Sequence, residues 1–259
     1  DNDPLPSLTI SDPTLLEGDA GTADMMFTVS LSAVSGRDVR VQFSTADGTA
    51  QAPGDYTAQP LTILNIPAGS LTGTILVPIV GDLLDEPDEA FVVNLTNPTN
   101  ATIADAQGIG VILDNDPLPT LSIDDPSVVE GDVGFVNMVF TIRLSAVSGK
   151  DVSVLAATAD GTAQAPGDYT ATPVAVAVKV DIPAGSLTGT VMVPVRGDLD
   201  DEVNETFFAN LSVPTNATIA DGQGVGTIID DDPKLDIDVQ SFTTRGAAGL
   251  NQLEIRYEI

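Results

Sequence analysis

Apolar and polar residues alternate in short runs along the chain, and each run ends at Gly, Pro, Asn or Asp. In Ala90–Leu95, the side chains of Phe91, Val93 and Leu95 would share one face, because successive side chains of a strand point to opposite faces. Other alternating or β-branched runs predict further strands, and no segment has the period of an amphipathic helix. In the first half of the chain these predicted strands are Met26–Leu31, Val39–Phe43, Gly73–Ile79, Ala90–Leu95 and Gly108–Leu113.

Long identical peptides occur twice and divide the chain into two repeats. TADGTAQAPGDYTA occupies Thr45–Ala58 and returns at Thr158–Ala171, where its Gly, Pro and Asp content is typical of a structured loop. A repeat of about 115 residues is too long for a solenoid unit and indicates tandem domains. The interval between copies grows from 113 to 116 residues (45 to 158, then 66 to 182), so three added residues lie in Val174–Asp181, where we expect a lengthened hairpin.

The repeat boundaries predict two complete domains and two incomplete neighbours. About seven short strands per repeat favour an all-β fold of two tandem immunoglobulin-like antiparallel β-sandwiches, followed by the start of a further β segment. No signal peptide is visible at the start, and we expect the chain to be a piece of a longer protein. The predicted parts are the end of a preceding repeat (1–4), the two domains (5–116 and 117–232) and the truncated start of a different β domain (233–259).

Composition excludes several classes of function. The chain has no His and no Cys, which excludes Ser-His-Asp and Cys-His catalysis, ordinary zinc and haem sites, and disulfides. No run of about 18 apolar residues is present, so we expect no membrane span in this piece. The formal net charge of −29 makes nucleic acid an unsuitable partner, because a phosphate backbone would be repelled. The partners that such a charge favours are cations.

Acidic residues lie at strand ends and in connections, at corresponding places in both repeats. Alternate connections of an antiparallel sandwich emerge at the same end, so these carboxylates can converge there. Crowded carboxylates need a counter-charge to stay ionised. Ca²⁺ takes six to eight oxygen ligands, and the absence of nitrogen and sulfur ligands favours it over zinc and copper. Mg²⁺ fits less well, because it prefers few carboxylates and retains water.

The spacing Glu-x2-Glu precedes a Phe-led strand in both repeats, at Glu86 and Glu89 and again at Glu202 and Glu205. Two side chains three residues apart cannot share one face of a straight strand. We therefore expect a curved loop that presents both carboxylates inward.

The acidity of the chain has two alternative interpretations. A halophilic protein is acidic everywhere, and charges also protect the edges of β-sheets. A lone Asp in a loop is usually a turn former, and this is our interpretation of Asp47 and Asp160 in the two Asp-Gly pairs. Neither halophilic acidity nor edge protection accounts for the clustering of acids in corresponding loops of both repeats.

Taken together, these motifs resemble the Calx-beta family, the modules of sodium/calcium exchangers and of long bacterial surface proteins. The motifs are Glu-Gly-Asp after the first strand, ADGTA-x3-GDYTA, IPAG, GD-x2-DE-x2-E-x-F and a closing acidic triplet followed by Pro. The resemblance implies a seven-stranded immunoglobulin-like sandwich with Ca²⁺ at one end. It implies ligands at Glu17, Asp55, Asp82, Glu86, Glu89, Asp114 and Asp116, with the Leu84 carbonyl, and at Glu130, Asp168, Asp198, Glu202, Glu205, Asp230, Asp231 and Asp232, with the Asp200 carbonyl.

Two departures from the exchanger pattern predict fewer ions or weaker binding. Exchanger-type sites carry consecutive acids where this chain has Gly81-Asp82 and Gly197-Asp198. Asn115 also replaces the middle acid of the first closing triplet, so we expect the larger loss in the first repeat.

Our leading hypothesis is a calcium-binding structural or adhesion module of a secreted or cell-surface protein of bacterial type. Its partners would be Ca²⁺, the neighbouring domains of the same chain and a cell-surface or matrix ligand. A calcium sensor that couples Ca²⁺ binding to the angle between domains is an alternative, and a metal-free acidic spacer is another. An enzyme with paired carboxylates, such as a glycoside hydrolase, is disfavoured because the chain has no Trp and only three Tyr.

Overall fold

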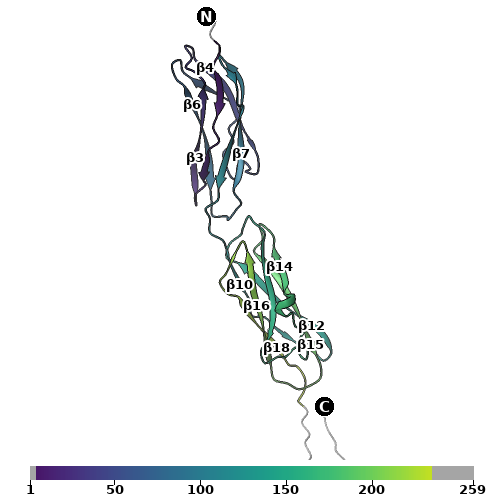
Figure 1. Ribbon diagram of the computed structural model, residues 1–259. Coiled ribbons are helices and arrows are strands. Elements are labelled where there is room, and N and C mark those ends of the chain that lie inside the picture. The colour runs from purple at the N-terminus through teal and green to yellow at the C-terminus, as the bar shows by residue number, and fades with distance from the viewer. Residues whose placement is uncertain (1–3, 235–259) are drawn as a thin grey trace, which may run out of the picture. The chain divides into compact units, whose positions relative to one another are not determined.

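The computed structural model describes residues 4–234 of the 259-residue chain, which form two compact units (Figure 1). The expected end of a preceding repeat lies mostly outside the described residues, as does nearly all of the expected start of a further β domain. Apart from a single 3-10 turn, the described part is all-β. It contains no helix of the length and apolar character needed to cross a membrane.

The first unit is a sandwich of a four-stranded and a five-stranded sheet, with strand orders β6-β3-β1-β8 and β2-β9-β7-β4-β5. Nine strands occur instead of about seven, because the first strand divides between the two sheets and a two-residue strand is added. The strands are β1 Ser7–Ile10, β2 Thr14–Leu16, β3 Gly21–Leu31, β4 Val39–Asp47, β5 Thr62–Ile66, β6 Thr72–Gly81, β7 Glu89–Thr99, β8 Thr102–Ile103 and β9 Gln107–Leu113.

The second unit repeats this topology, with sheets β15-β12-β10-β17 and β11-β18-β16-β13-β14. Its strands are β10 Thr120–Ile123, β11 Ser127–Val129, β12 Gly134–Leu144, β13 Val152–Asp160, β14 Val178–Ile182, β15 Thr188–Gly197, β16 Glu205–Thr215, β17 Thr218–Ile219 and β18 Gln223–Ile229.

The division of the first strand follows from the sequence between β1 and β2. β1 pairs with β3 in one sheet and β2 pairs with β9 in the other. Pro13 stands between them, where a residue without an N–H cannot continue a ladder. The carboxylate of Asp12 accepts a hydrogen bond from the N–H of Ile109 at 2.7 Å and so joins this corner to the second sheet. The β1–β8 and β2–β9 pairs are parallel, whereas the other strand pairs of the unit are antiparallel.

Each core consists of the inward side of these strands. Phe91, Val93 and Leu95 of β7 are buried, as their alternation predicted. The ring of Phe91 meets Phe27 edge-on, with ring centroids 5.8 Å apart, and stacks on Tyr56 at 4.3 Å. The second unit repeats both contacts with Phe207 in place of Phe91. Aromatic side chains thus fill the middle of each sandwich although they are few.

The prediction of a lengthened hairpin in Val174–Asp181 was wrong. β14 has the five residues of β5, and both strands pair with their neighbours in the same way. The added residues instead form a 3-10 turn, Val174–Val176, before β14 begins. An insertion in a connection leaves the sheet register unchanged, whereas a longer hairpin would have extended both strands.

Replacing Phe91 by Ala should lower the free energy of unfolding by about 3–5 kcal/mol, because it leaves a cavity between both aromatic partners. Val92→Ala on the opposite face of β7 is the matched control and should cost much less. Denaturant unfolding of the whole chain, followed by circular dichroism, measures both. Equal losses for the two variants would contradict the assignment of the faces of β7.

Candidate metal centre

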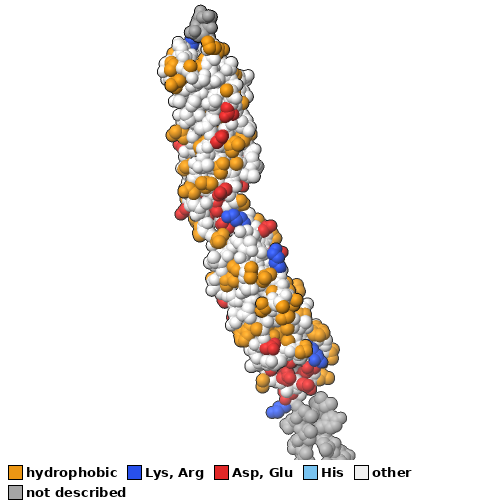
Figure 2. All heavy atoms as spheres, viewed as in Figure 1, with side chains coloured by type: hydrophobic (Ala, Val, Ile, Leu, Met, Phe, Trp, Pro, Cys, Tyr) orange, Lys and Arg blue, Asp and Glu red, His pale blue; other side chains and the backbone are white. Residues whose placement is uncertain are grey.

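Four connections of each sandwich meet at one end. In the first unit, Glu17 directly follows β2, Asp55 lies in the loop after β4, Glu86 lies between β6 and β7, and Asp114 directly follows β9. On the face shown in Figure 2, acidic side chains gather at the corresponding end of the second unit. The fold therefore brings together residues that are far apart in the sequence, as alternate connections of a sandwich allow.

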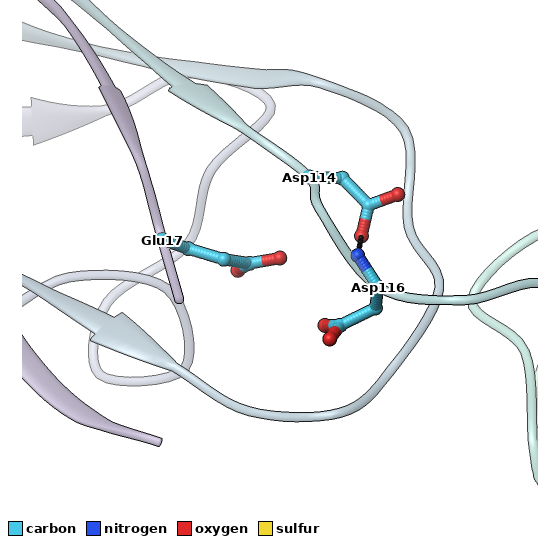
Figure 3. A group of neighbouring side chains, drawn as sticks. All are labelled: Glu17, Asp114 and Asp116. Carbon is cyan, nitrogen blue, oxygen red and sulfur yellow. Dashed lines mark hydrogen bonds between the residues drawn. The ribbon is translucent and has the colours of Figure 1, made fainter. Parts of the chain in front are cut away.

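Glu17, Asp114 and Asp116 form the first carboxylate group, in which one oxygen of each side chain lies within 4.8 Å of the others. Figure 3 shows Glu17 pointing from the end of β2 toward the two aspartates after β9. The residues Glu17 and Asp116 are only 7% and 9% exposed. Among the described residues, Oε1 of Glu17 and both oxygens of Asp116 are buried without a hydrogen-bond partner. Buried, unpartnered carboxylate oxygens are costly unless a cation or a proton compensates them.

Backbone amides hold the first group in place. Oδ1 of Asp114 accepts hydrogen bonds from the N–H groups of Glu86 at 3.2 Å and Asp116 at 3.4 Å. The carboxylate of Asp88 in turn accepts from the N–H of Asp114 at 3.1 Å. Asp88 was not among the predicted site residues, because its spacing gave no sign that it would face a residue 26 positions later.

Asp55, Glu86 and Glu89 form the second carboxylate group, again with one oxygen of each within 4.8 Å of the others. All three residues are half-buried. Glu86 lies in the loop and Glu89 begins β7, so the two residues do not lie on one straight strand. The Glu-x2-Glu spacing therefore brings both carboxylates to one place through a curved segment, as predicted.

The second unit contains two equivalent groups. In its first group, Asp232 is 8% exposed, and both of its carboxylate oxygens are buried without a hydrogen-bond partner in the described part of the chain. Asp230 accepts from the N–H of Glu202 at 3.2 Å, as Asp114 does from Glu86. The groups are Glu130, Asp230 and Asp232, and Asp168, Glu202 and Glu205.

Five predicted ligands lie outside these groups of three: Asp82, Leu84, Asp198, Asp200 and Asp231. The carboxylate of Asp82 accepts a hydrogen bond from the N–H of Leu84 at 2.7 Å, and that of Asp198 accepts from Asp200 at 3.0 Å. Burial is the main cause that raises the pKa of Glu17 and of Glu86, and the charge of Asp82 contributes to both shifts. As ligands, these five stay predictions, and so do the twelve residues of the four groups.

The middle residue of each closing triplet braces a loop. Oδ1 of Asp231 accepts from the N–H of Gly131 at 3.0 Å, and Oδ1 of Asn115 accepts from the N–H of Gly18 at 2.9 Å. An amide oxygen can accept this bond as well as a carboxylate oxygen can. The replacement of an acid by Asn115 therefore changes the charge but keeps the hydrogen bond.

The crowding of carboxylates shifts their protonation. Burial, followed by the charges of Asp114 and Asp116, raises the pKa of Glu17 to about 7. Burial, followed by a hydrogen bond to Asp55, raises the pKa of Glu89 to about 7. In the second unit, burial followed by nearby charges, that of Asp198 first, raises the pKa of Glu130 to about 7, and burial followed by a hydrogen bond to Asp168 raises the pKa of Glu205 to about 7. Without a cation, each unit thus retains protons near neutral pH that ordinary glutamates would have lost.

Steric crowding explains why glycine occupies the position before Asp82. A side chain on Gly81 would collide with the carbonyl oxygens of Gly18 and Glu17, because that loop packs directly on the end of β6. Gly197 meets the carbonyl oxygen of Gly131 in the same way. An acid in place of Gly81 or Gly197 is therefore incompatible with the backbone of this end.

In the presence of a chelator, the protein should be more stable at pH 5.5 than at pH 8. A pKa raised from 4.5 to about 7 contributes stability that is fully present below pH 4.5 and is lost as the pH rises through 7. Melting temperatures across this range measure the effect. Glu17→Gln combined with Glu130→Gln should raise the melting temperature at pH 8, because the variants remove two buried charges. A wild-type protein that is more stable at pH 8 would contradict the assigned shifts.

Gly81→Ala should cost about 1–3 kcal/mol of folding free energy, because the added methyl group forces the Glu17–Gly18 backbone away. Gly36→Ala is the control, since nothing lies within 4 Å of a side chain added there. It should change the stability by less than about 0.5 kcal/mol. Denaturant unfolding of both variants measures the difference. If Gly81→Ala left the folding free energy unchanged, the Glu17–Gly18 loop would have to be free to move away.

Comparison with known proteins identifies the family of this chain. The family model of the Calx-beta domain matches residues 1–116 and again residues 114–232. Sodium/calcium exchanger 1 of Canis lupus familiaris is 29% identical over 197 residues, which cover 68% of this chain, and the exchanger of Rattus norvegicus is 28% identical. The chain spans about a fifth of the length of these exchangers, since the match covers 20% of each.

Solved structures of similar proteins include the tandem CBD12 of CALX1.2, which is 18% identical with a TM-score of 0.40. That match covers 80% of each chain. The apo form of the Calx CBD1 domain is 22% identical with a TM-score of 0.39, and the match covers 44% of this chain and all of that domain. The two matches to the family model cover nearly all of the described residues. The chain therefore belongs to the Calx-beta family and contains two of its domains.

Proposed function

We propose that each acidic end binds Ca²⁺ and that the bound ions stiffen a tandem array in a secreted or cell-surface protein. The observation that carries this proposal is the state of Asp116 and Asp232. Both are buried, both of their oxygens are without a hydrogen-bond partner in the described part of the chain, and each lies in a group of three carboxylates. A divalent cation satisfies all of these oxygens at once.

The chemistry of the donors favours Ca²⁺ over other cations. Every candidate side-chain ligand is a carboxylate, and backbone carbonyls are the other available donors. Ca²⁺ accepts such sets of six to eight oxygens in irregular geometry, whereas Mg²⁺ requires a near-octahedral shell and retains several waters. The two groups of each unit offer two ion positions, and Asp82 or Asp198 is suited to bridge them.

The position of the closing acids in the chain supports a structural role. In the first unit, only Pro117, Leu118 and Pro119 separate Asp116 from the start of β10. An ion held by Glu17, Asp114 and Asp116 would therefore order the segment that enters the next unit. Outside cells Ca²⁺ is abundant, and affinities of about 10⁻⁴–10⁻³ M suffice for extracellular modules. Such an array could present a surface to a cell-surface or matrix ligand.

Calorimetric titration of the chelator-stripped chain with Ca²⁺, in physiological salt and with Mg²⁺ present, tests the proposal. We expect one or more ions per unit to bind at millimolar or submillimolar concentration and to raise the melting temperature. Glu17→Gln should weaken binding, because it removes a ligand from the first group. Asp24→Asn removes the same charge from an exposed position on β3 and should have little effect.

Three different results of this titration would change the conclusion. Micromolar binding would favour the sensor over the structural module. No heat and an unchanged melting temperature would overturn the proposal and leave an acidic spacer. Equal weakening by Glu17→Gln and Asp24→Asn would mean that Ca²⁺ only screens the surface charge.

A further inference from the structure

We propose that Asp47 and Tyr56 are positioning residues for the Asp55 carboxylate, and that Asp160 and Tyr169 do the same for Asp168. This inference rests on the proposed binding of Ca²⁺. It gives a structural role to the peptide that occurs twice in the chain, at Thr45–Ala58 and Thr158–Ala171. It also replaces our interpretation of Asp47 and Asp160 as turn formers only.

The side chains of Tyr56 and Asp47 are hydrogen-bonded to each other at the base of the loop that follows β4. Tyr56 is 1% exposed, and its hydroxyl donates to Oδ1 of Asp47 at 2.6 Å. The same oxygen accepts from the N–H of Ala52 at 3.1 Å. The hydroxyl bond is the main reason why the pKa of Asp47 is lowered, so this carboxylate stays ionised. Asp47 belongs to neither group of carboxylates, and its acceptor oxygen is used within the loop.

The second repeat reproduces the pair with the same geometry. The hydroxyl of Tyr169 donates to Oδ1 of Asp160 at 2.6 Å, and the N–H of Ala165 donates to that oxygen at 3.1 Å. Tyr169 is also 1% exposed. The two cores are not identical, since Ala156 and Ala157 of β13 replace Phe43 and Ser44 of β4. Both units nevertheless contain the same hydrogen-bonded pair.

The Tyr56 ring ties the loop to the strand that carries Glu89. It stacks on the ring of Phe91 with centroids 4.3 Å apart and planes 13° apart. Phe91 lies two residues after Glu89, and Tyr56 directly follows Asp55. Asp47 is also the cross-strand partner of Phe91 in the β4–β7 pair. The stacked rings therefore hold the backbones of two ligands of the second group at a set separation.

Backbone hydrogen bonds hold the loop to β6 on both sides of Tyr56. The N–H of Thr57 donates to the carbonyl oxygen of Pro78 at 2.8 Å, and the N–H of Val80 donates to that of Asp55 at 2.9 Å. One oxygen of the Asp55 carboxylate also accepts from the N–H of Gln51 at 2.6 Å. Movement of the Asp55 backbone would break the first two bonds, and rotation of its carboxylate would break the third. Second-layer contacts of this kind set the orientation of metal ligands.

A purely structural role for Tyr56 is the competing hypothesis, because a buried aromatic side chain stabilises any core. The two hypotheses make different predictions for a variant that removes only the hydroxyl group. Tyr56→Phe keeps the ring and its stacking but removes the hydroxyl. A structural role predicts lower stability with unchanged affinity, whereas a positioning role predicts weaker binding at one ion position.

The experiment uses the full chain in a background in which Glu130→Gln and Glu202→Gln weaken both groups of the second unit. Calorimetric Ca²⁺ titration then reports the first unit. We expect Tyr56→Phe to weaken the ion held by Asp55, Glu86 and Glu89 by about 10-fold or more, as loss of a second-layer partner typically does. The ion held by Glu17, Asp114 and Asp116 should keep its affinity.

Matched variants separate positioning from stability. Asp47→Ala should weaken the same ion, and the double variant with Tyr56→Phe should be no weaker than the worse single variant. Asp47→Asn keeps an oxygen that accepts both hydrogen bonds and should retain near wild-type affinity. Ile66→Val lowers the stability of a buried site at the end of β5, which pairs with the start of β4, and should leave both affinities unchanged.

The possible results distinguish this inference from the proposed function. If the background protein binds Ca²⁺ at two positions and Tyr56→Phe changes only the melting temperature, the positioning role is wrong and the proposed function stands. Loss of both ions in Tyr56→Phe would also overturn the positioning role, because the effect would not be confined to the ion held by Asp55, Glu86 and Glu89. If the wild-type chain binds no Ca²⁺, the proposed function fails first.

Discussion

Repulsion and desolvation among buried carboxylates constrain the rest of each unit. Burial raises the pKa of Glu17, and the charges of Asp114 and Asp116 raise it further, so ionisation of this carboxylate is costly. At the first end the ammonium group of Lys150 lies 3.3 Å from an oxygen of Asp114, and the remaining negative charge has to be compensated by protons or by a cation. Because a divalent ion brings two charges and accepts several oxygens, it satisfies the end more completely than protons do.

A second layer of hydrogen bonds keeps the carboxylates together despite their repulsion. Asp88 binds the N–H of Asp114, Asn115 binds the N–H of Gly18, and Tyr56 binds Asp47. These bonds join neighbouring connections to one another and to the core. These bonds do not depend on an ion, so less of the free energy of ion binding has to be used for ordering the loops.

The sequence allowed accurate predictions where one repeating pattern or one spacing decides the outcome. Alternation placed Phe91 in the core, and the Glu86–Glu89 spacing indicated a bent segment. The division of the acids into groups of three, the bracing role of Asp231 and the bond between Asp47 and Tyr56 depend on which loops lie side by side. Such neighbours are set by tertiary structure, and no local pattern records them. The 3-10 turn at Val174–Val176 was missed because sequence length shows where residues are added but not how they fold.

The two units balance charge and burial differently at equivalent positions. At the second end, Asp200 and Asp231 replace two neutral residues of the first end and Asn204 replaces one acid, so the second end carries one more formal negative charge. Glu202 is exposed, however, whereas its counterpart Glu86 is half-buried. Exposed charges attract a cation over a distance but are screened by salt, whereas buried contacts are screened much less. Cation binding at the second end should therefore depend more strongly on ionic strength, and binding at the first end should depend more on the exact placement of its ligands.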